Sequence, residues 1–136
     1  MKKNFRILWV EDDASVIKDQ VRPLEKDGCK IDIAEDMMQV LSLMEVLGEY
    51  DLLLLDILIP DGSRKPTNLN SYVGVDLLYK IRALYPDLPV IVLTVVTDPK
   101  IQEKIYLGDV RRILPKGSCL PSKLRQAVYE ELGVSV

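Results

Sequence analysis

Acidic side chains follow two apolar runs of the sequence, at the point where each run stops. Glu11, Asp12 and Asp13 come directly after one run, and Asp56 follows four leucines in another. Carboxylates that share a small region repel one another unless a cation lies between them. Mg²⁺ binds through one or two carboxylates and keeps waters that phosphate oxygens can replace. Glu11, Asp12 and Asp56 are therefore candidates for a divalent-cation site, whereas Asp13 is a plausible helix N-cap.

Two further polar residues close apolar runs later in the chain. Thr94 ends the run PVIVLT (89–94), and Lys116 follows a shorter run. A hydroxyl and an ammonium both suit the oxygens of a phosphoryl group, and the Asp56 carboxylate could form an acyl phosphate. The chain has no histidine, which excludes Ser-His-Asp and Cys-His nucleophiles and a phosphohistidine on this chain. The set favours phosphoryl transfer, which needs mainly positioning and charge neutralisation.

Each of these residues also has an ordinary structural interpretation. Glu11 and Asp12 could serve a helix N-terminus, where negative charge is favoured. Threonine is common in strands, and Lys116 beside Gly117 could be a solvated loop lysine. Asp56 is harder to explain in this way, since a carboxylate directly after a buried strand is costly unless it is used. The functional interpretation depends on whether the fold brings these residues together.

Length and composition are those of one globular domain. The 136 residues are 48% apolar and 29% charged, and the net charge of −3 argues against a dedicated nucleic-acid surface. No apolar run approaches the ~20 residues that span a bilayer, and no secretory signal is evident. Cys29 and Cys119 form no metal-ligand cluster, so we expect reduced thiols in a cytoplasmic protein.

Five short apolar runs alternate with five amphipathic segments. Strands are predicted at 5–10, 30–34, 51–55, 89–96 and 111–114, and helices at 13–27, 37–47, 74–85, 99–107 and 121–132. Pro23 predicts an irregular end to the first helix, Gly48 closes the second, and Leu84 belongs to the apolar face of the third. The pattern predicts an α/β fold of the flavodoxin-like type, a three-layer (βα)5 domain with parallel sheet order 2-1-3-4-5.

One edge of this sheet would collect the candidate residues. Right-handed crossovers place the carboxyl ends of all the strands at one edge, and the binding crevice lies where the strand order reverses, between strands one and three. Glu11, Asp12 and Asp56 would converge at that crevice, and Thr94 and Lys116 would line the same rim. This joint placement supports the functional interpretation more strongly than any single residue does.

Four motifs occur in the order typical of a known family. They are ILWVEDD (7–13), LLLLDILIPDG (52–62), PVIVLT (89–94) and LPKG (114–117). Together they resemble the receiver domain of two-component response regulators over essentially the whole chain. The resemblance implies that Asp56 accepts a phosphoryl group from the phosphohistidine of a sensor histidine kinase or phosphotransfer protein. It also implies that Thr94 and Lys116 bind the phosphoryl group and relay the change.

The resemblance further implies a Mg²⁺ site and an output surface. Asp12 would bind Mg²⁺ with help from Glu11, Asp56 and the backbone carbonyl of Leu58. The output surface, which could also form a homodimer, would be the fourth helix, fifth strand and fifth helix. Its candidate contacts are the basic residues Lys100, Lys104, Arg111 and Arg112. We expect no separate substrate, only self-phosphorylation and autodephosphorylation at Asp56, and the sequence does not identify the output domain or protein.

The sequence departs from the family pattern at several positions. Ile113 stands where an aromatic switch residue is usual, and Val95 follows Thr94 where a small residue is usual. These departures predict that the usual coupling to an aromatic rotamer is missing and that the phosphoryl pocket is crowded. Leu58 and Val96 flank the expected path of water and offer nothing to orient it, which predicts a long-lived phosphoaspartate.

The connection between the third strand and the third helix is longer than the family pattern. The excess predicts an extended loop at about 61–73, within a single receiver domain of residues 1–136. One interpretation of the loop is a flexible surface insertion. The alternative is a lid or a partner contact in which Arg64 or Lys65 reaches the phosphate.

Three other functions compete with phosphorylation-dependent signalling. The main alternative is a receiver-like protein-interaction module that does not depend on phosphorylation, which Val95 and Ile113 favour. A haloacid dehalogenase-type phosphatase needs a second acid two residues after its nucleophile, where this chain has Leu58. A flavodoxin-like redox protein needs a phosphate-binding loop after the first strand, and the acidic residues there would repel that phosphate.

Overall fold

A parallel five-stranded sheet forms the centre of the computed structural model, which describes residues 4–60, 62 and 73–135. The strands are β1 (Arg6–Val10), β2 (Lys30–Ala34), β3 (Leu52–Leu55), β4 (Val90–Thr94) and β5 (Arg112–Pro115). Their order is β2-β1-β3-β4-β5, which confirms the predicted order. Most of the predicted loop at 61–73, including Arg64 and Lys65, lies outside the described residues.

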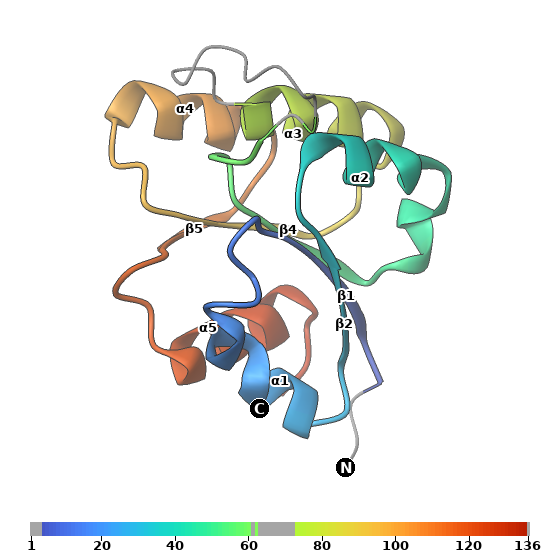
Figure 1. Cartoon of the computed structure of the whole chain (residues 1–136), viewed down its shortest axis with the longest axis vertical. Helices are drawn as coiled ribbons and strands as arrows, with labels where there is room; N and C mark the ends of the chain where they lie inside the picture. Colours follow the sequence, from blue (N-terminus) through green and yellow to red (C-terminus); the bar gives the residue numbers. More distant parts are fainter. Residues whose placement is uncertain (1–3, 61, 63–72, 136) are drawn as a thin grey trace.

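Helices cover both faces of the sheet (Figure 1). The α-helices are α1 (Arg22–Lys26), α2 (Met37–Ser42), α3 (Val73–Leu84), α4 (Pro99–Leu107) and α5 (Pro121–Glu131), and the 3₁₀ helices are η1 (Lys18–Val21) and η2 (Met44–Glu49). One face carries α2, α3 and α4, and the other carries α1 and α5. The predicted three-layer α/β fold is therefore confirmed. Within the described ranges, no helix combines the length and apolar character needed to cross a bilayer.

The central strands are buried on both faces, which explains their continuous apolar sequences. All four side chains of β3 are fully buried. Successive side chains of a strand point to opposite faces, so Leu53 and Leu55 pack with the residues of α2, α3 and α4. Leu52 and Leu54 pack with the residues of α1 and α5. These two apolar layers hold the sheet in place and so position the residues at its carboxyl edge.

The predicted helix at 13–27 is wrong in its first half. Turns and η1 come first, and an α-helix begins only at Arg22. Asp13 is not the N-cap of a long helix; its backbone carbonyl accepts a hydrogen bond from the N–H of Ile17 at 3.1 Å. Pro23 lies in the first turn of α1 rather than at an irregular end. A proline is tolerated there because the first turn of a helix has no use for its missing N–H.

The second helix and the end of the third also differ from the prediction. α2 ends at Ser42, and Gly48 lies inside η2, so this glycine does not close a helix that began at Met37. The segment tightens into 3₁₀ turns instead, as helix ends often do. Leu84 is the last residue of α3 and is 63% exposed, so the buried face of that helix stops at Ile81.

The start of α3 packs against the backbone that carries Asp56. A Cβ atom at Gly74 would lie 2.3 Å from the Cα of Ile57 and 2.9 Å from the carbonyl oxygen of Asp56. We therefore expect Gly74→Ala to force α3 away from β3 and to lower the free energy of unfolding by ~1–3 kcal/mol, measured by urea titration. Gly117→Ala is the matched control, because no described atom lies within 4 Å of a Cβ there. Equal stability of the two variants would contradict this account.

Candidate functional site

The carboxyl edge of the sheet brings the predicted site residues together. The backbone N–H of Asp56 donates to the carbonyl of Val10 at 3.1 Å, and that of Lys116 donates to the carbonyl of Thr94 at 3.0 Å. These bonds continue the β1–β3 and β4–β5 pairings past the end of one strand of each pair. The residues that follow neighbouring strands therefore lie side by side, as the sequence predicted.

Three of the acidic residues form one cluster. Glu11, Asp12 and Asp56 each offer a carboxylate oxygen, and these oxygens all lie within 4.8 Å of one another. Glu11 and Asp56 are buried, whereas Asp12 is exposed. Asp13 is not a member of this cluster, and its backbone N–H donates to Glu11 Oε1 at 3.1 Å. The geometry matches the predicted cation-binding set.

Lys116 pairs with both buried carboxylates. Its Nζ lies 2.7 Å from Glu11 Oε1 and 3.0 Å from Asp56 Oδ2, and its side chain is only 16% exposed. Burial disfavours the ammonium, but the hydrogen bonds and charges of the two carboxylates outweigh this effect and raise the pKa of Lys116. Lys116 is therefore not a solvated loop lysine. Its positive charge lies between the carboxylates of Glu11 and Asp56 at the sheet edge and reduces their repulsion.

Among the residues that the structure describes, none donates a hydrogen bond to one buried carboxylate oxygen of Glu11. Burial raises the pKa of Glu11 to about 7, although hydrogen bonds from Lys116 and Asp13 act in the opposite direction. Its Oε2 atom accepts no hydrogen bond from the described residues. With Asp12 and Asp56, Glu11 forms an oxygen-only ligand set that fits a hard cation such as Mg²⁺. A cation would also give the Oε2 atom the partner that the described side chains do not supply.

Hydrogen-bond donors hold both oxygens of Asp56. The backbone N–H of Leu58 donates to Oδ1 at 3.0 Å, and Lys116 Nζ donates to Oδ2 at 3.0 Å. The first bond is of the Asx-turn type, in which an aspartate accepts from the backbone two residues on. The Leu58 carbonyl as a metal ligand stays a prediction, and the hydrogen bond from the Leu58 N–H to Asp56 was not predicted. The sequence signal for this Asx turn was the position of Asp56, an aspartate at the end of a predicted strand and directly before a loop.

Thr94 is buried beside a cleft. Its Oγ1 accepts a hydrogen bond from the backbone N–H of Val96 at 3.3 Å. The cleft has a volume of about 340 Å³ and is lined by residues that include Thr94, Val95 and Ile113. Val95 is 57% exposed, and Ile113 is partly buried against the core. Crowding by Val95 and the loss of an aromatic switch at Ile113 stay predictions.

Comparison with known proteins identifies a family. Residues 7–129 match the family model described as the response regulator receiver domain. The transcription factor SKN7 of Saccharomyces cerevisiae is 35% identical to this chain over 74 residues, which are 53% of this chain and 12% of that protein. The matched region is therefore a small part of that relative's length.

Solved structures share the fold over nearly the full length. A CheY-like receiver domain protein from Methanospirillum hungatei has a TM-score of 0.79 at 24% identity and covers 96% of this chain and 95% of its own. A two-component response regulator from Clostridium difficile has a TM-score of 0.78 at 22% identity over 96% and 97% of the two chains. The non-phosphorylated HemR receiver domain from Leptospira biflexa has a TM-score of 0.77 at 23% identity over 98% of both. These structures establish the fold, and the match over residues 7–129 establishes that this chain belongs to the response regulator receiver domain family.

Proposed function

We propose that Asp56 is a phosphoacceptor in two-component signalling and that its phosphorylation requires Mg²⁺. The observation that carries this proposal is the contact of Lys116 with Asp56 and Glu11 inside a cluster completed by Asp12. Such a site combines a carboxylate nucleophile with positive charge and a cation-binding set, and family membership supports the same assignment.

The reaction is transfer of a phosphoryl group from a phosphohistidine of a partner protein. Leu58 N–H holds Oδ1 of Asp56, which leaves Oδ2 to attack the phosphorus atom once Lys116 moves from it. A P–O bond forms while the P–N bond breaks, and the donor imidazole leaves and takes a proton from water. Lys116 then binds one phosphoryl oxygen, and the Thr94 hydroxyl donates to another.

A cation is needed because Lys116 offsets only one of the negative charges at the site. Glu11, Asp12, Asp56 and the carbonyl of Leu58 would hold Mg²⁺. When bound, Mg²⁺ neutralises the clustered carboxylates and the phosphoryl oxygens, as phosphoryl transfer requires. The orphan oxygen of Glu11 supports this ligand set.

The partners follow from the same chemistry. The donor would be a sensor histidine kinase or a phosphotransfer protein, and we expect the exchange to occur in the cytoplasm. The output domain or protein would contact α4, β5 and α5, the face that could also form a homodimer. Lys100, Lys104 and Arg111 are exposed there, whereas Arg112 is engaged with two glutamates of α5 at 2.5 and 2.7 Å. The first three are therefore better contact candidates.

Intact-protein mass spectrometry tests the proposal. Incubation with a small phosphodonor such as acetyl phosphate should add one phosphoryl group in the presence of Mg²⁺ and none after chelation of the metal. A phosphorylated histidine phosphotransfer protein should give the same product faster. A folded chain that binds Mg²⁺ in a titration but gains no phosphoryl group would contradict the proposal. It would favour the alternative of an interaction module that does not depend on phosphorylation, which the departures from the family pattern at Val95 and Ile113 also favour.

Leu58 and Val96 offer no polar side chain to orient an attacking water. Leu58 is 38% exposed and Val96 is half-buried. We therefore expect the isolated phosphoprotein to lose its phosphoryl group slowly and Leu58→Gln to speed that loss by roughly tenfold, because the amide can position a water. The decay of the phosphorylated mass after removal of the donor measures both rates. Leu107→Gln, at an exposed position of α4, is the control; fast loss from the wild type would contradict this prediction.

A further inference from the structure

The loop that follows β3 is held on both sides of Leu58. The carbonyl of Ile57 accepts a hydrogen bond from the backbone N–H of Gly74 at 3.1 Å, and the carbonyl of Pro60 accepts one from the N–H of Met37 at 3.0 Å. The carbonyl of Leu58 accepts none from the described residues. Two anchored carbonyls therefore flank the one that the proposed function assigns to Mg²⁺.

The side chain of Ile59 fixes the depth of the same loop. Ile59 is buried and belongs to the same apolar layer as Val40 of α2 and Leu77 of α3. The neighbouring Leu58 side chain is partly exposed instead. Because Ile59 is held between the sheet and these helices, the position of the Leu58 carbonyl depends on where α2 and α3 begin.

Gly62 lies directly on the first turn of α2. Its φ of 91° is in the left-handed region that favours glycine. A Cβ atom at this position would lie 2.7 Å from Cγ of Met38 and 2.9 Å from Oδ1 of Asp36. The backbone angle and the close contacts both require a residue without a side chain, so Gly62 brings the loop against α2 as no other residue type could.

The first turn of α2 is a fixed support for this contact. Asp36 Oδ1 accepts the N–H of Gln39 at 2.8 Å, and Gln39 Oε1 accepts the N–H of Glu35 at 2.8 Å. This is the reciprocal arrangement of a capping box, which orders the start of a helix. The oxygen that Gly62 approaches is therefore held in place, and so is the neighbouring N–H of Met37 that binds the loop.

We propose that Gly62 is a positioning residue for Mg²⁺ binding. Its close packing on the first turn of α2 preserves the bond between Met37 and Pro60, and this bond fixes the Leu58 carbonyl as a metal ligand. The inference rests on the proposed function, because that function makes this carbonyl a ligand. Gly62 itself touches neither the cation nor the phosphoryl group. A side chain at position 62 would displace the loop and leave every carboxylate of the cluster in place.

Calorimetric titration with Mg²⁺ tests the proposal on the wild type and Gly62→Ala. The Kd for Mg²⁺ should rise by about tenfold, the scale on which groups that support a ligand change metal affinity. At saturating Mg²⁺ the rate of phosphoryl uptake should stay within about threefold of the wild type, since Asp56, Lys116 and Thr94 keep their positions. An unchanged Kd, or a slow rate that saturating Mg²⁺ does not restore, would overturn the proposal.

Gly133→Ala is the control for backbone strain. Gly133 also has a positive φ, 71°, but nothing lies within 4 Å of a Cβ atom there. The variant therefore carries a similar conformational cost without a clash and far from the site in sequence. Its Kd for Mg²⁺ should equal that of the wild type. A rise as large as that of Gly62→Ala would mean that strain anywhere in the chain weakens the cation site.

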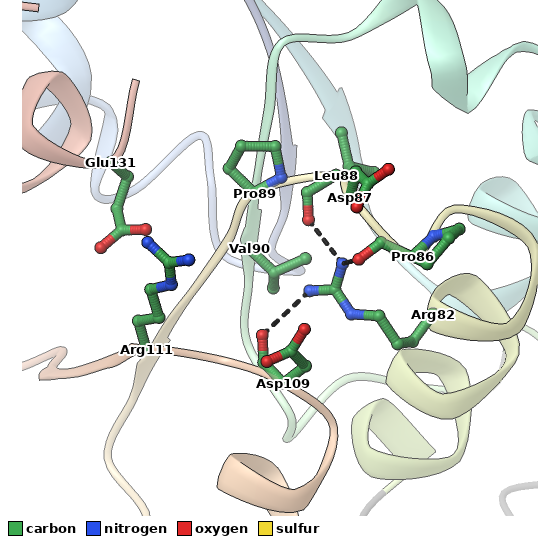
Figure 2. A pocket seen from close by; sticks show the side chains of 9 residues that line it. All are labelled: Arg82, Pro86, Asp87, Leu88, Pro89, Val90, Asp109, Arg111 and Glu131. Atoms are coloured by element: carbon green, nitrogen blue, oxygen red, sulfur yellow. Dashed lines mark hydrogen bonds between the residues drawn. The ribbon is translucent and has the colours of Figure 1, made fainter. Parts of the chain in front are cut away.

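Arg82→Lys separates positioning from a general loss of stability. Arg82 donates to the carbonyls of Tyr85, Pro86 and Leu88 in the turn before β4, at the opposite edge of the sheet from the acidic cluster (Figure 2). A lysine lacks this fixed fork of donors, so the free energy of unfolding should fall. The Kd for Mg²⁺ should not change. Weaker Mg²⁺ binding in this variant, to the extent seen in Gly62→Ala, would overturn the proposal.

Two variants of Asp36 keep the proposal testable if Gly62→Ala does not fold. Asp36→Ala removes the oxygen that caps α2, whereas Asp36→Asn removes the charge and keeps an oxygen that can accept the N–H of Gln39. We expect the alanine variant to raise the Kd for Mg²⁺ by about fivefold and the asparagine variant to stay within about twofold of the wild type. Equal effects would show that charge matters here, and not the support of the loop.

Amide exchange in the metal-free chain gives a readout that needs neither Mg²⁺ nor phosphodonor. In Gly62→Ala, exchange of the Met37 N–H should speed by about fivefold, the effect of losing its bond to Pro60. Unchanged exchange would overturn the positioning role, whatever the mass measurement shows. A wild-type chain that binds Mg²⁺ but gains no phosphoryl group would instead refute the phosphoacceptor function and leave the positioning role standing.

Discussion

Asp56→Asn is expected to gain no phosphoryl group from a small donor or from a phosphohistidine protein. An amide has no charged oxygen to attack phosphorus, so the loss should be complete rather than partial. The fold should survive, because the amide oxygen can still accept the N–H of Leu58, and Lys116 keeps Glu11 as a partner. Intact mass measures the uptake, and thermal unfolding verifies the fold.

Asp13→Asn is the matched control for this experiment. It removes the same charge from a neighbouring loop, but Asp13 lies outside the cluster of carboxylate oxygens. We expect its phosphoryl uptake to stay within about twofold of the wild type, since the carboxylate of Asp13 is exposed to solvent and screened by salt. Uptake by Asp56→Asn at the wild-type rate would place the acceptor at another residue and would refute the proposed function.

Lys116→Met should slow phosphoryl uptake by at least about 100-fold, which is typical of removing one preorganised charge donor from a phosphoryl or oxyanion site. It should also destabilise the metal-free fold, by about 2 kcal/mol at pH 8, because Glu11 and Asp56 would lose their shared hydrogen-bond donor. At pH 6 the loss should be smaller. The pKa of Glu11 is already about 7, so this carboxyl can take up a proton at pH 6 and remove the repulsion.

Urea titrations at the two pH values and the rate of mass gain check this prediction. Lys26→Met, at an exposed position in α1, is the control and should leave the rate and both stabilities unchanged. If Lys116→Met takes up the phosphoryl group at the wild-type rate, Lys116 has no role in phosphoryl transfer. A stability loss that is equal at pH 6 and pH 8 would show that Glu11 does not relieve the unpaired charge.

The strand order and the placement of the candidate site residues at one sheet edge could be predicted because they depend on short-range patterns. Continuous apolar runs indicate strands buried on both faces, and the regular alternation with helical segments leaves few ways to connect them. A parallel sheet then places all strand ends at one edge. Glu11, Asp56 and Lys116 therefore came together as expected, although Glu11 and Lys116 lie 105 positions apart along the chain.

Local helix geometry was harder to predict. The region before Arg22 forms turns and 3₁₀ helix, and Gly48 sits inside η2, because tertiary packing overrides the weak preferences of these short segments. Side-chain partners at long range were not predictable either. The five carbonyls that Arg82 binds belong to two connections that become neighbours only in the folded chain. The two acceptors that Lys116 binds were not predictable either, because the pairing depends on side-chain rotamers.

Reductive trapping of the phosphorylated wild-type chain tests the central claim most directly. Borohydride reduces an acyl phosphate to an alcohol, so the modified aspartate becomes homoserine and can be located by peptide mass spectrometry. We predict homoserine at position 56 after incubation with phosphodonor and Mg²⁺, and none when Mg²⁺ is withheld. Homoserine at position 12 or at another acidic residue, or an unmodified Asp56 in protein that has gained phosphoryl mass, would contradict the account.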